Sequence, residues 1–316
     1  MNDGQQFYLK MSLILATAFF IWIFGSSKEE FSALKAENSS EWQPKTPVAF
    51  TNFVPPTLVV FKDSENTLPK RNWATPFLEL KAEVALAIRT DGSRVYYNKN
   101  IEIQRPVASL TKLMTAIIVL ENYDLDEVIK IPLNAVRREG ATGDLKPDES
   151  ITVRSLLNIM LIDSSNDAAF ALAEKRADFV SLMNKKAKEL GLVNTHFSNP
   201  DGLDEPGNYS SALDVEKIFN YLINKYPEAF EILKTKNMVV YSADGKIEHR
   251  LKNTNELFDK MNEVVAGKTG YTSEAGGSLI LLTKDNIITV VLGSPDRFGE
   301  SEKLIQWLKS AYIWEK

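Results

Sequence analysis

Two short stretches around position 90 alternate apolar with small or polar residues, the pattern of half-buried strands. Residues 81–89 carry Val, Leu and Ile at every second position, and residues 94–97 follow with a valine and two tyrosines. The Asp91-Gly92 pair between them favours a tight turn. The pattern predicts a β-hairpin.

The apolar spacing changes after position 108 to that of amphipathic helices. Residues 109–120 (SLTKLMTAIIVL) place apolar side chains three and four positions apart. Helical patterns also occur at residues 153–161, 166–174, 179–190 and, close to the end of the chain, 301–312. The sequence therefore predicts a block of helices and, much later, a terminal helix.

Strand patterns return between these helices. Residues 238–241, 263–268, 278–282 and 287–292 are short apolar runs that end at polar or glycine-containing turns. The order is a hairpin, a helical block, antiparallel strands and a final helix. This order predicts an α+β domain in which the N-terminal and C-terminal strands share one sheet.

The amino terminus has a different character. Residues 11–24 carry no charge and follow Lys10, as in a segment that enters a membrane. We expect residues 1–27 to be a membrane anchor or a cleaved signal peptide, with residues 7–24 as the tether if it is retained. Both interpretations put the rest of the chain outside the cytoplasm, in the periplasm or cell envelope.

Residues 28–77 are rich in Ser, Glu, Lys and Pro and contain only short apolar patches. Such a segment cannot bury enough apolar surface to offset its ordering entropy, so we expect a flexible linker with at most one docked strand. The predicted folded domain is then residues 78–316.

Composition removes several classes of function. A formal net charge of −5 with scattered Lys and Arg argues against nucleic acid as a partner. The chain has no cysteine, which excludes a thiol nucleophile, a thiolate zinc site and an iron–sulfur cluster. With His196 and His249 as the only histidines, a Ser/His/Asp triad would depend on one of them.

Ser109 and Lys112 stand three residues apart at the start of a predicted helix, so both project from one face. A serine hydroxyl needs a neighbouring base, and a partly buried lysine beside another cation has its pKa lowered enough to serve. In isolation, however, S-x-x-K more often marks a helix start with a serine N-cap.

Two further patterns lie at structural boundaries. Ser164 and Asn166 stand between two predicted helices, where a loop directs a hydroxyl and an amide into a cleft, or where a serine simply caps the next helix. Lys268, Thr269 and Gly270 end a predicted strand. The cation and hydroxyl suit a carboxylate, and glycine permits close approach of a peptide; a plain strand-end turn is the alternative.

The three patterns together carry far more information than each alone. S-x-x-K, S-x-N and K-T-G in this order form the motif set of penicillin-binding proteins and serine β-lactamases. The chain resembles the low-molecular-mass D-alanyl-D-alanine carboxypeptidases, the peptidase family S11, over residues 79–316. The resemblance is carried by residues 108–116 (ASLTKLMTA), 164–169 (SSNDAA), 196–214 (HFSNPDGLDEPGNYSSALD), 251–257 (LKNTNEL) and 267–277 (GKTGYTSEAGG).

This resemblance implies a penicillin-binding protein/serine β-lactamase-like fold, an antiparallel sheet flanked by helices. It implies that Ser109 attacks the carbonyl between the last two D-alanines of a peptidoglycan stem peptide and that Lys112 accepts its proton. Ser164 then passes a proton to the leaving amine. Asn166 holds the substrate amide and orients Lys112.

The remaining implied roles concern substrate binding. Lys268 and Thr269 bind the terminal carboxylate, while the strand around Gly270 holds the peptide. The oxyanion hole consists of the main-chain N–H groups of Ser109 and Tyr271, so the position of Tyr271 matters and its ring does not. The family needs no metal or organic cofactor, and β-lactams are expected to acylate the serine.

Other activities stay open. Single-domain relatives of the family include D,D-endopeptidases, which act on cross-linked peptidoglycan. A β-lactamase and a non-catalytic β-lactam-binding module are less favoured. The matching position of His196 in the family lies in a structural loop, and residues 205–208 fit the carboxypeptidase pattern better than the deacylating loop of class A β-lactamases.

Overall fold

The computed structural model describes residues 69–314 of the chain. The expected membrane segment and residues 28–68 of the expected linker lie outside the described residues. The strands are β1 (Lys70–Arg71), β2 (Val84–Arg89), β3 (Val95–Lys99), β4 (Val128–Lys130), β5 (Ser150–Thr152), β6 (Asn237–Tyr241), β7 (Glu248–Lys252), β8 (Val264–Thr272), β9 (Gly276–Thr283), β10 (Ile287–Ser294) and β11 (Tyr312–Ile313). The helices are the 3₁₀ helix η1 (Ala108–Thr111), α3 (Lys112–Asn122), α4 (Leu133–Val136), α5 (Val153–Ile162), α6 (Asn166–Glu174), α7 (Phe179–Glu189), α8 (Ala212–Lys225), α9 (Pro227–Lys234), α10 (Leu257–Lys260) and α11 (Arg297–Ala311).

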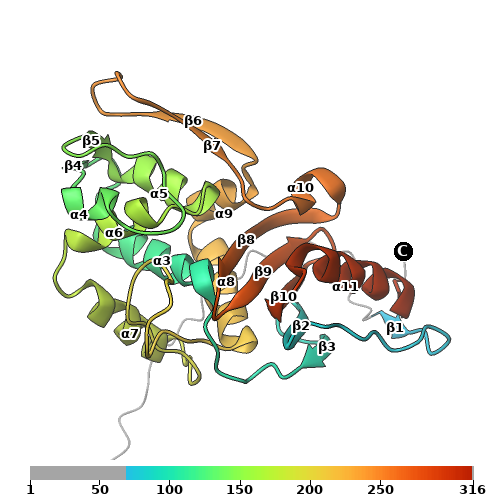
Figure 1. Ribbon diagram of the computed structural model, residues 1–316. Helices are drawn as coiled ribbons and strands as arrows, with labels where there is room; N and C mark the ends of the chain where they lie inside the picture. Colours follow the sequence, from blue (N-terminus) through green and yellow to red (C-terminus); the bar gives the residue numbers. More distant parts are fainter. Residues whose placement is uncertain (1–68, 315–316) are drawn as a thin grey trace, which may run out of the picture. The chain divides into compact units, whose positions relative to one another are not determined.

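A five-stranded antiparallel sheet in the order β3-β2-β10-β9-β8 organises this part of the chain (Figure 1). Val290 of β10 pairs with Leu86 of β2 on one side and with Ile280 of β9 on the other. The prediction that N-terminal and C-terminal strands share one sheet is therefore confirmed. Strand β8, which carries the K-T-G pattern, lies at one edge.

Both faces of the sheet are covered by helices. On β2, Leu86 belongs to the large core cluster shared with α3 and α8, whereas Ala85 and Ala87 belong to the cluster that includes Leu304 and Leu308 of α11. Successive strand residues point to opposite faces, which explains this division. The small alanines leave room for α11 to pack against the sheet. This helix is the terminal helix that the sequence predicts.

The helical block contains the helices that the apolar spacing predicts for it, and the described residues form four further α-helices, α4, α8, α9 and α10. Helices α8 and α9 were not predicted, although both carry start signals. The Ser211 hydroxyl accepts a hydrogen bond from the Asp214 N–H and caps α8, while Pro227 occupies the first turn of α9. Strand β7 was also missed; it pairs with β6 in a hairpin separate from the main sheet.

The last residues of the expected linker pack onto the domain. Strand β1 pairs antiparallel with β11, and the Arg71 guanidinium lies 5.2 Å from the centre of the Trp307 ring. The domain boundaries at residues 27 and 77 stay predictions. Among the described residues, no helix combines the length and apolar character that crossing a membrane requires.

Candidate active site

Ser109 lies in the 3₁₀ turn η1, directly before α3, so the predicted helix at residues 109–120 begins as a tighter turn. The preceding residue, Ala108, has a positive φ of 51°, a conformation that is costly for a residue with a side chain. The Lys112 Nζ atom lies 2.8 Å from the Ser109 Oγ atom. The hydroxyl and amine thus meet across one turn, as their spacing predicts.

Lys112 is fully buried at the start of α3. Its amine also donates hydrogen bonds to the Asn166 Oδ1 atom at 2.7 Å and the Asp201 carbonyl oxygen at 2.6 Å. Burial is the main cause that lowers the pKa of Lys112 to about 7. A lysine in this state is neutral in a large fraction of molecules at pH 7 and is able to accept a proton.

The loop between α5 and α6 supplies two polar groups to the same place. Ser165 caps α6 by accepting a hydrogen bond from the Ala168 N–H at 2.9 Å. Ser164 has a positive φ of 63°, and the Asn166 side-chain amide donates to the Glu139 carbonyl oxygen at 2.7 Å. Helix capping and side chains turned into the site therefore coexist on different residues of one motif.

Lys268 on β8 is the second fully buried amine. Its Nζ atom donates to the Ser164 Oγ atom at 2.7 Å and to the Thr269 carbonyl oxygen at 3.0 Å. Burial, followed by the positive charges of Lys112 and Arg297, holds the pKa of Lys268 well below its usual range. Two serine–lysine pairs thus lie in one poorly hydrated space, where charge on one amine disfavours charge on the other.

Strand β8 runs on to Thr272, so the expectation that Lys268, Thr269 and Gly270 end a strand is wrong. Pairing with β9 continues up to the Thr272–Gly276 pair, which keeps the whole motif within the ladder. A Cβ atom on Gly270 would lie 3.0 Å from the Ser109 nitrogen. Glycine therefore lets this edge strand pack against the backbone of the serine.

The side chains that follow the second lysine differ in exposure. The Thr269 hydroxyl lies 2.5 Å from the Thr254 hydroxyl in a buried position. Tyr271 is 68% exposed, so its ring adds little to the interior of the site.

Arg297, the first residue of α11, is a neighbour of the site that the sequence did not indicate. Its guanidinium donates to the Gly270 carbonyl oxygen at 3.2 Å and lies 5.9 Å from the Tyr271 ring centre. Burial lowers the pKa of Arg297, although its guanidinium stays charged. No local pattern marks this residue, because only the packing of α11 beside β8 brings it there.

Arg138 and Asp201 were also missed. Asp201 lies within the segment at residues 196–214 that carries part of the family resemblance, and its carbonyl oxygen contacts Lys112. The Arg138 Nε atom pairs with the Asp201 Oδ2 atom at 2.5 Å. Because these two residues are 63 positions apart, only the fold reveals the pair.

Neither histidine is hydrogen-bonded to the serine. The His196 Nδ1 atom lies 2.6 Å from the Gly207 carbonyl oxygen in a surface loop. His249 is buried, with its Nε2 atom 2.7 Å from the Glu149 carboxylate. Both imidazoles are engaged in other contacts, whereas the Lys112 amine lies within hydrogen-bonding distance of Ser109.

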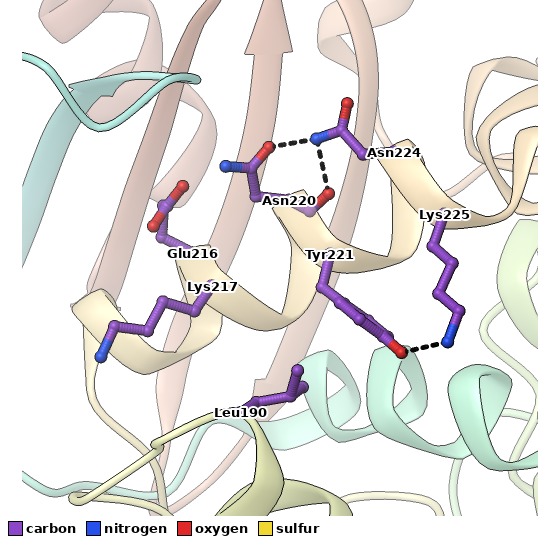
Figure 2. A pocket seen from close by; sticks show the side chains of 7 residues that line it. All are labelled: Leu190, Glu216, Lys217, Asn220, Tyr221, Asn224 and Lys225. Carbon is purple, nitrogen blue, oxygen red and sulfur yellow. Dashed lines mark hydrogen bonds between the residues drawn. The ribbon is translucent and has the colours of Figure 1, made fainter. Parts of the chain in front are cut away.

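A separate hollow of about 250 Å³ runs along α8 and contains none of the motif residues (Figure 2). Glu216 is its buried acidic residue, and burial raises the pKa of that carboxyl to about 7. Within residues 69–314, no group of three acidic or histidine side chains is arranged to hold a metal ion. The residues that line the hollow are Leu190, Glu216, Lys217, Asn220, Tyr221, Asn224 and Lys225.

An antiparallel sheet flanked by helices, with a serine one turn ahead of a buried lysine, is typical of penicillin-binding proteins and serine β-lactamases. The sequence matches the D-alanyl-D-alanine carboxypeptidase family, peptidase S11, over residues 70–296, and the chain belongs to this family. The predicted family is therefore confirmed.

Curated relatives include carboxypeptidases and an endopeptidase. D-alanyl-D-alanine carboxypeptidase DacF of Bacillus subtilis (strain 168) is 35% identical over 254 residues, which are 75% of this chain and 64% of that protein. DacC of Escherichia coli (strain K12) is 36% identical over 236 residues, 68% of this chain and 58% of that protein. The D-alanyl-D-alanine endopeptidase of Pseudomonas aeruginosa is 30% identical over 248 residues, 74% of this chain and 79% of that protein. The chain thus spans about three fifths of the length of the two carboxypeptidases.

Solved structures agree with the family. The crystal structure of the Streptomyces K15 DD-transpeptidase superposes with a TM-score of 0.69 at 29% identity and covers 74% of this chain and 98% of its own. The D-alanyl-D-alanine carboxypeptidase from Mycobacterium tuberculosis H37Rv gives a TM-score of 0.69 at 26% identity, covering 76% and 96%. The predicted α+β fold of the penicillin-binding protein and serine β-lactamase type is confirmed.

Proposed function

We propose that this protein is a serine-type D-Ala-D-Ala carboxypeptidase that removes the terminal D-alanine of peptidoglycan stem peptides through an acyl-enzyme. The observation that carries this proposal is the buried Lys112 amine, with a pKa of about 7, at 2.8 Å from the Ser109 hydroxyl. Membership of the family and the names of the curated relatives support the choice of substrate.

Acylation begins with proton transfer. Neutral Lys112 takes the proton of Ser109 as the Oγ atom attacks the carbonyl between the two D-alanines. The oxyanion then accepts hydrogen bonds from the main-chain N–H groups of Ser109 and Tyr271. Gly270 supports this role because its lack of a side chain brings β8 against the serine backbone. Each such donor is worth about 3 kcal/mol of transition-state stabilisation.

The leaving amine needs a proton before D-alanine departs. Ser164 passes on its hydroxyl proton and regains the one that Lys112 took from Ser109, which returns Lys112 to its neutral form. The hydrogen bond of 2.7 Å from Lys268 to the Ser164 Oγ atom supports this relay because it holds the hydroxyl in place. Asn166 holds the substrate amide while its Oδ1 atom keeps Lys112 in place. A water molecule then attacks the acyl-enzyme, with Lys112 as the base.

The terminal carboxylate of the substrate requires positive charge and a hydroxyl. We assign it to Lys268 and Thr269, with the peptide lying along the edge strand around Gly270. Arg297 adds a permanent positive charge beside this strand, supported by its hydrogen bond to the Gly270 carbonyl oxygen. Unlike the lysine, its guanidinium stays charged when the pKa values of the buried amines fall.

A D,D-endopeptidase acting on cross-linked peptidoglycan is the second candidate. The Pseudomonas aeruginosa relative with that name supports it, because this chain covers 79% of that protein and a smaller share of the carboxypeptidases. A non-catalytic β-lactam-binding module is less favoured because both serine–lysine pairs are intact. A β-lactamase is less favoured because residues 205–208 fit the carboxypeptidase pattern better than the deacylating loop of class A β-lactamases. The proposed location is outside the cytoplasmic membrane, tethered through residues 7–24.

The test uses the purified full-length chain with a stem pentapeptide and, separately, a cross-linked muropeptide. Mass spectrometry identifies the products. Loss of one D-alanine from the pentapeptide supports the carboxypeptidase, and cleavage of the cross-link alone supports the endopeptidase. Labelled penicillin should acylate Ser109, and labelling that persists in Ser109→Ala would overturn the proposal. An acyl-enzyme hydrolysed within seconds would instead indicate a β-lactamase.

A further inference from the structure

A closed ring of contacts surrounds the Lys112 amine. The amine donates to the Asn166 Oδ1 atom, and the amide of Asn166 donates to the carbonyl oxygen of Glu139. The neighbouring residue in the chain, Arg138, pairs with the Asp201 carboxylate, whose own main-chain carbonyl accepts from Lys112 at 2.6 Å. Arg138 and Asp201 therefore complete a ring that begins and ends at the proposed base.

The ion pair in this ring is partly enclosed. The Asp201 side chain is fully buried, whereas that of Arg138 is 28% exposed. A second contact joins the Arg138 Nη2 atom to the Asp201 Oδ1 atom at 3.3 Å, and the guanidinium lies 5.1 Å from the Phe170 ring centre. A buried carboxylate is stable only with a partner of opposite charge. The pair therefore restrains both loops that bear it.

Movement of the Asp201 loop would reach the serine directly. The next residue, Gly202, has a positive φ of 86°, and a Cβ atom there would lie 2.0 Å from the Ala108 carbonyl oxygen. The loop is thus pressed against the residue that precedes Ser109. Its position affects both members of the serine–lysine pair.

We propose that Arg138 and Asp201 form a positioning pair for the base: their ion pair holds the Asp201 carbonyl against the Lys112 amine and balances the charges beside it. This proposal rests on the proposed function, since it assumes that Lys112 accepts the proton of Ser109. Both residues act through Lys112 and are not expected to contact the substrate.

Because both residues are charged, replacing either one should shift the pH at which Lys112 titrates, which a purely structural role would not do. The groups that act on Lys112 come from several elements: Asp201 in its loop, Asp167 on α6, Arg138 after α4, and Lys268 on β8. The two carboxylates raise the pKa of Lys112, while Arg138 lowers it. Removing Arg138 should therefore move the titration of the base to higher pH, and removing the Asp201 charge should move it to lower pH.

The experiment measures the second-order rate of Ser109 acylation by a fluorescent penicillin from about pH 5.5 to 9.5, with the full-length chain. Arg138→Gln should shift the acidic limb of the profile upward by about half to one pH unit. Asp201→Asn should shift it downward by a similar amount. The double variant should restore the limb to near its original position, while the plateau rate falls several-fold in all three because the carbonyl is less firmly held.

A matched control is available on the surface. Arg176 and Asp178 form an exposed two-contact pair, with both distances at 3.0 Å. Arg176→Gln and Asp178→Asn make the same charge changes away from the ring and should leave the limb and the plateau unchanged. Arg138→Lys keeps the positive charge, so its limb should stay in place even if its plateau falls.

The outcomes separate the two proposals. If the wild-type chain is not acylated, or if Ser109→Ala is acylated equally well, the proposed function fails. If the wild type is acylated at Ser109 but the limbs of Arg138→Gln and Asp201→Asn coincide with its own, the positioning pair is refuted. Equal shifts in the surface controls would also refute it. Thermal unfolding of each variant verifies that the compared proteins are folded. If Arg138→Gln does not fold, the downward shift of the limb expected for Asp201→Asn decides the test.

Discussion

Lys112 and Glu216 are two buried ionisable side chains in the same domain, and burial brings the pKa of each to about 7. Their surroundings differ. The Lys112 amine makes hydrogen bonds of 2.6 to 2.8 Å with a serine, an asparagine and a main-chain carbonyl. For Glu216, which is 5% exposed, the acting neighbours are the amide of Asn220 and the charge of Lys217.

The hollow beside Glu216 contains no equivalent of the serine. Figure 2 shows Glu216 and Asn220 on one side of α8 and Tyr221 on the other. The Tyr221 hydroxyl donates to Glu121 at 3.0 Å and accepts from Lys225 at 2.6 Å, so it is already occupied. A shifted pKa marks a candidate for function, but a reactive group within hydrogen-bonding distance is what distinguishes a site.

Replacing the two groups should separate them most clearly. Lys112→Met keeps the length and burial of the side chain but removes the base, so penicillin acylation of Ser109 should fall about 10³- to 10⁴-fold. Glu216→Gln should leave the rate within about twofold of the wild type. Stopped-flow acylation of both purified variants checks this. A loss above tenfold in Glu216→Gln would contradict the distinction drawn between the two regions.

The pH dependence of acylation should follow Lys112 and ignore Glu216. The base is active when neutral, and with a pKa of about 7 its neutral fraction falls tenfold for each pH unit below that value. The neutral fraction is about one half at pH 7 and about 1% at pH 5, so the rate should drop about 50-fold between these pH values. Glu216→Gln should reproduce the same profile. A profile flat from pH 5 to 7 would remove Lys112 as the titrating base.

Through Glu216, the free energy of unfolding should fall as pH rises, whereas the acylation rate rises. The Glu216 carboxyl has a folded-state pKa of about 7 against an ordinary value of 4.5. Between these values the native state holds the proton that the unfolded state releases, so this group costs stability as pH rises from 4.5 to 7. Glu216→Gln should raise the free energy of unfolding by about 3 kcal/mol at pH 8 and by much less at pH 4.

Urea unfolding at both pH values measures this difference. The Lys112 amine affects the free energy of unfolding over a different pH range. Its folded-state pKa lies below the ordinary 10.5, so the unfolded state binds the extra proton and stability rises with pH from about 7 to 10.5. A Glu216→Gln variant that gains equal stability at pH 4 and pH 8 would indicate a packing effect and not the carboxyl charge.

The same contrast explains how far the sequence reaches. Ser109 and Lys112 are one helical turn apart, so local spacing predicts their contact. Ser164 and Lys268 are 104 positions apart, and only the resemblance to a family assigned them to one site. Neither a local pattern nor one of the three motifs marks Arg297, and the fold alone brings it beside β8.

The fold shows a similar limit. Alternation along β2 and apolar spacing along α3 follow from local periodicity, and both elements are present. Helix α8 was missed despite its serine cap, because Glu216 stands at a buried position of the helix, where its charge masks the apolar stripe. The tertiary structure buries this carboxyl without a cationic contact, which a sequence pattern that places charged residues at the surface does not reveal.

The smallest predicted effect concerns Lys217, whose positive charge acts on the Glu216 carboxyl. Lys217 lowers the pKa of Glu216, opposing burial, and its own side chain is 37% exposed and 3.4 Å from Asp214. Because solvent screens an exposed charge, Lys217→Met should raise the Glu216 pKa by only a few tenths of a unit. Carbon-13 NMR of the Glu216 carboxyl measures this titration. Lys225→Met, about two turns further along α8, is the control. A downward shift in Lys217→Met would show that the lysine acts on Glu216 through packing and not through its charge.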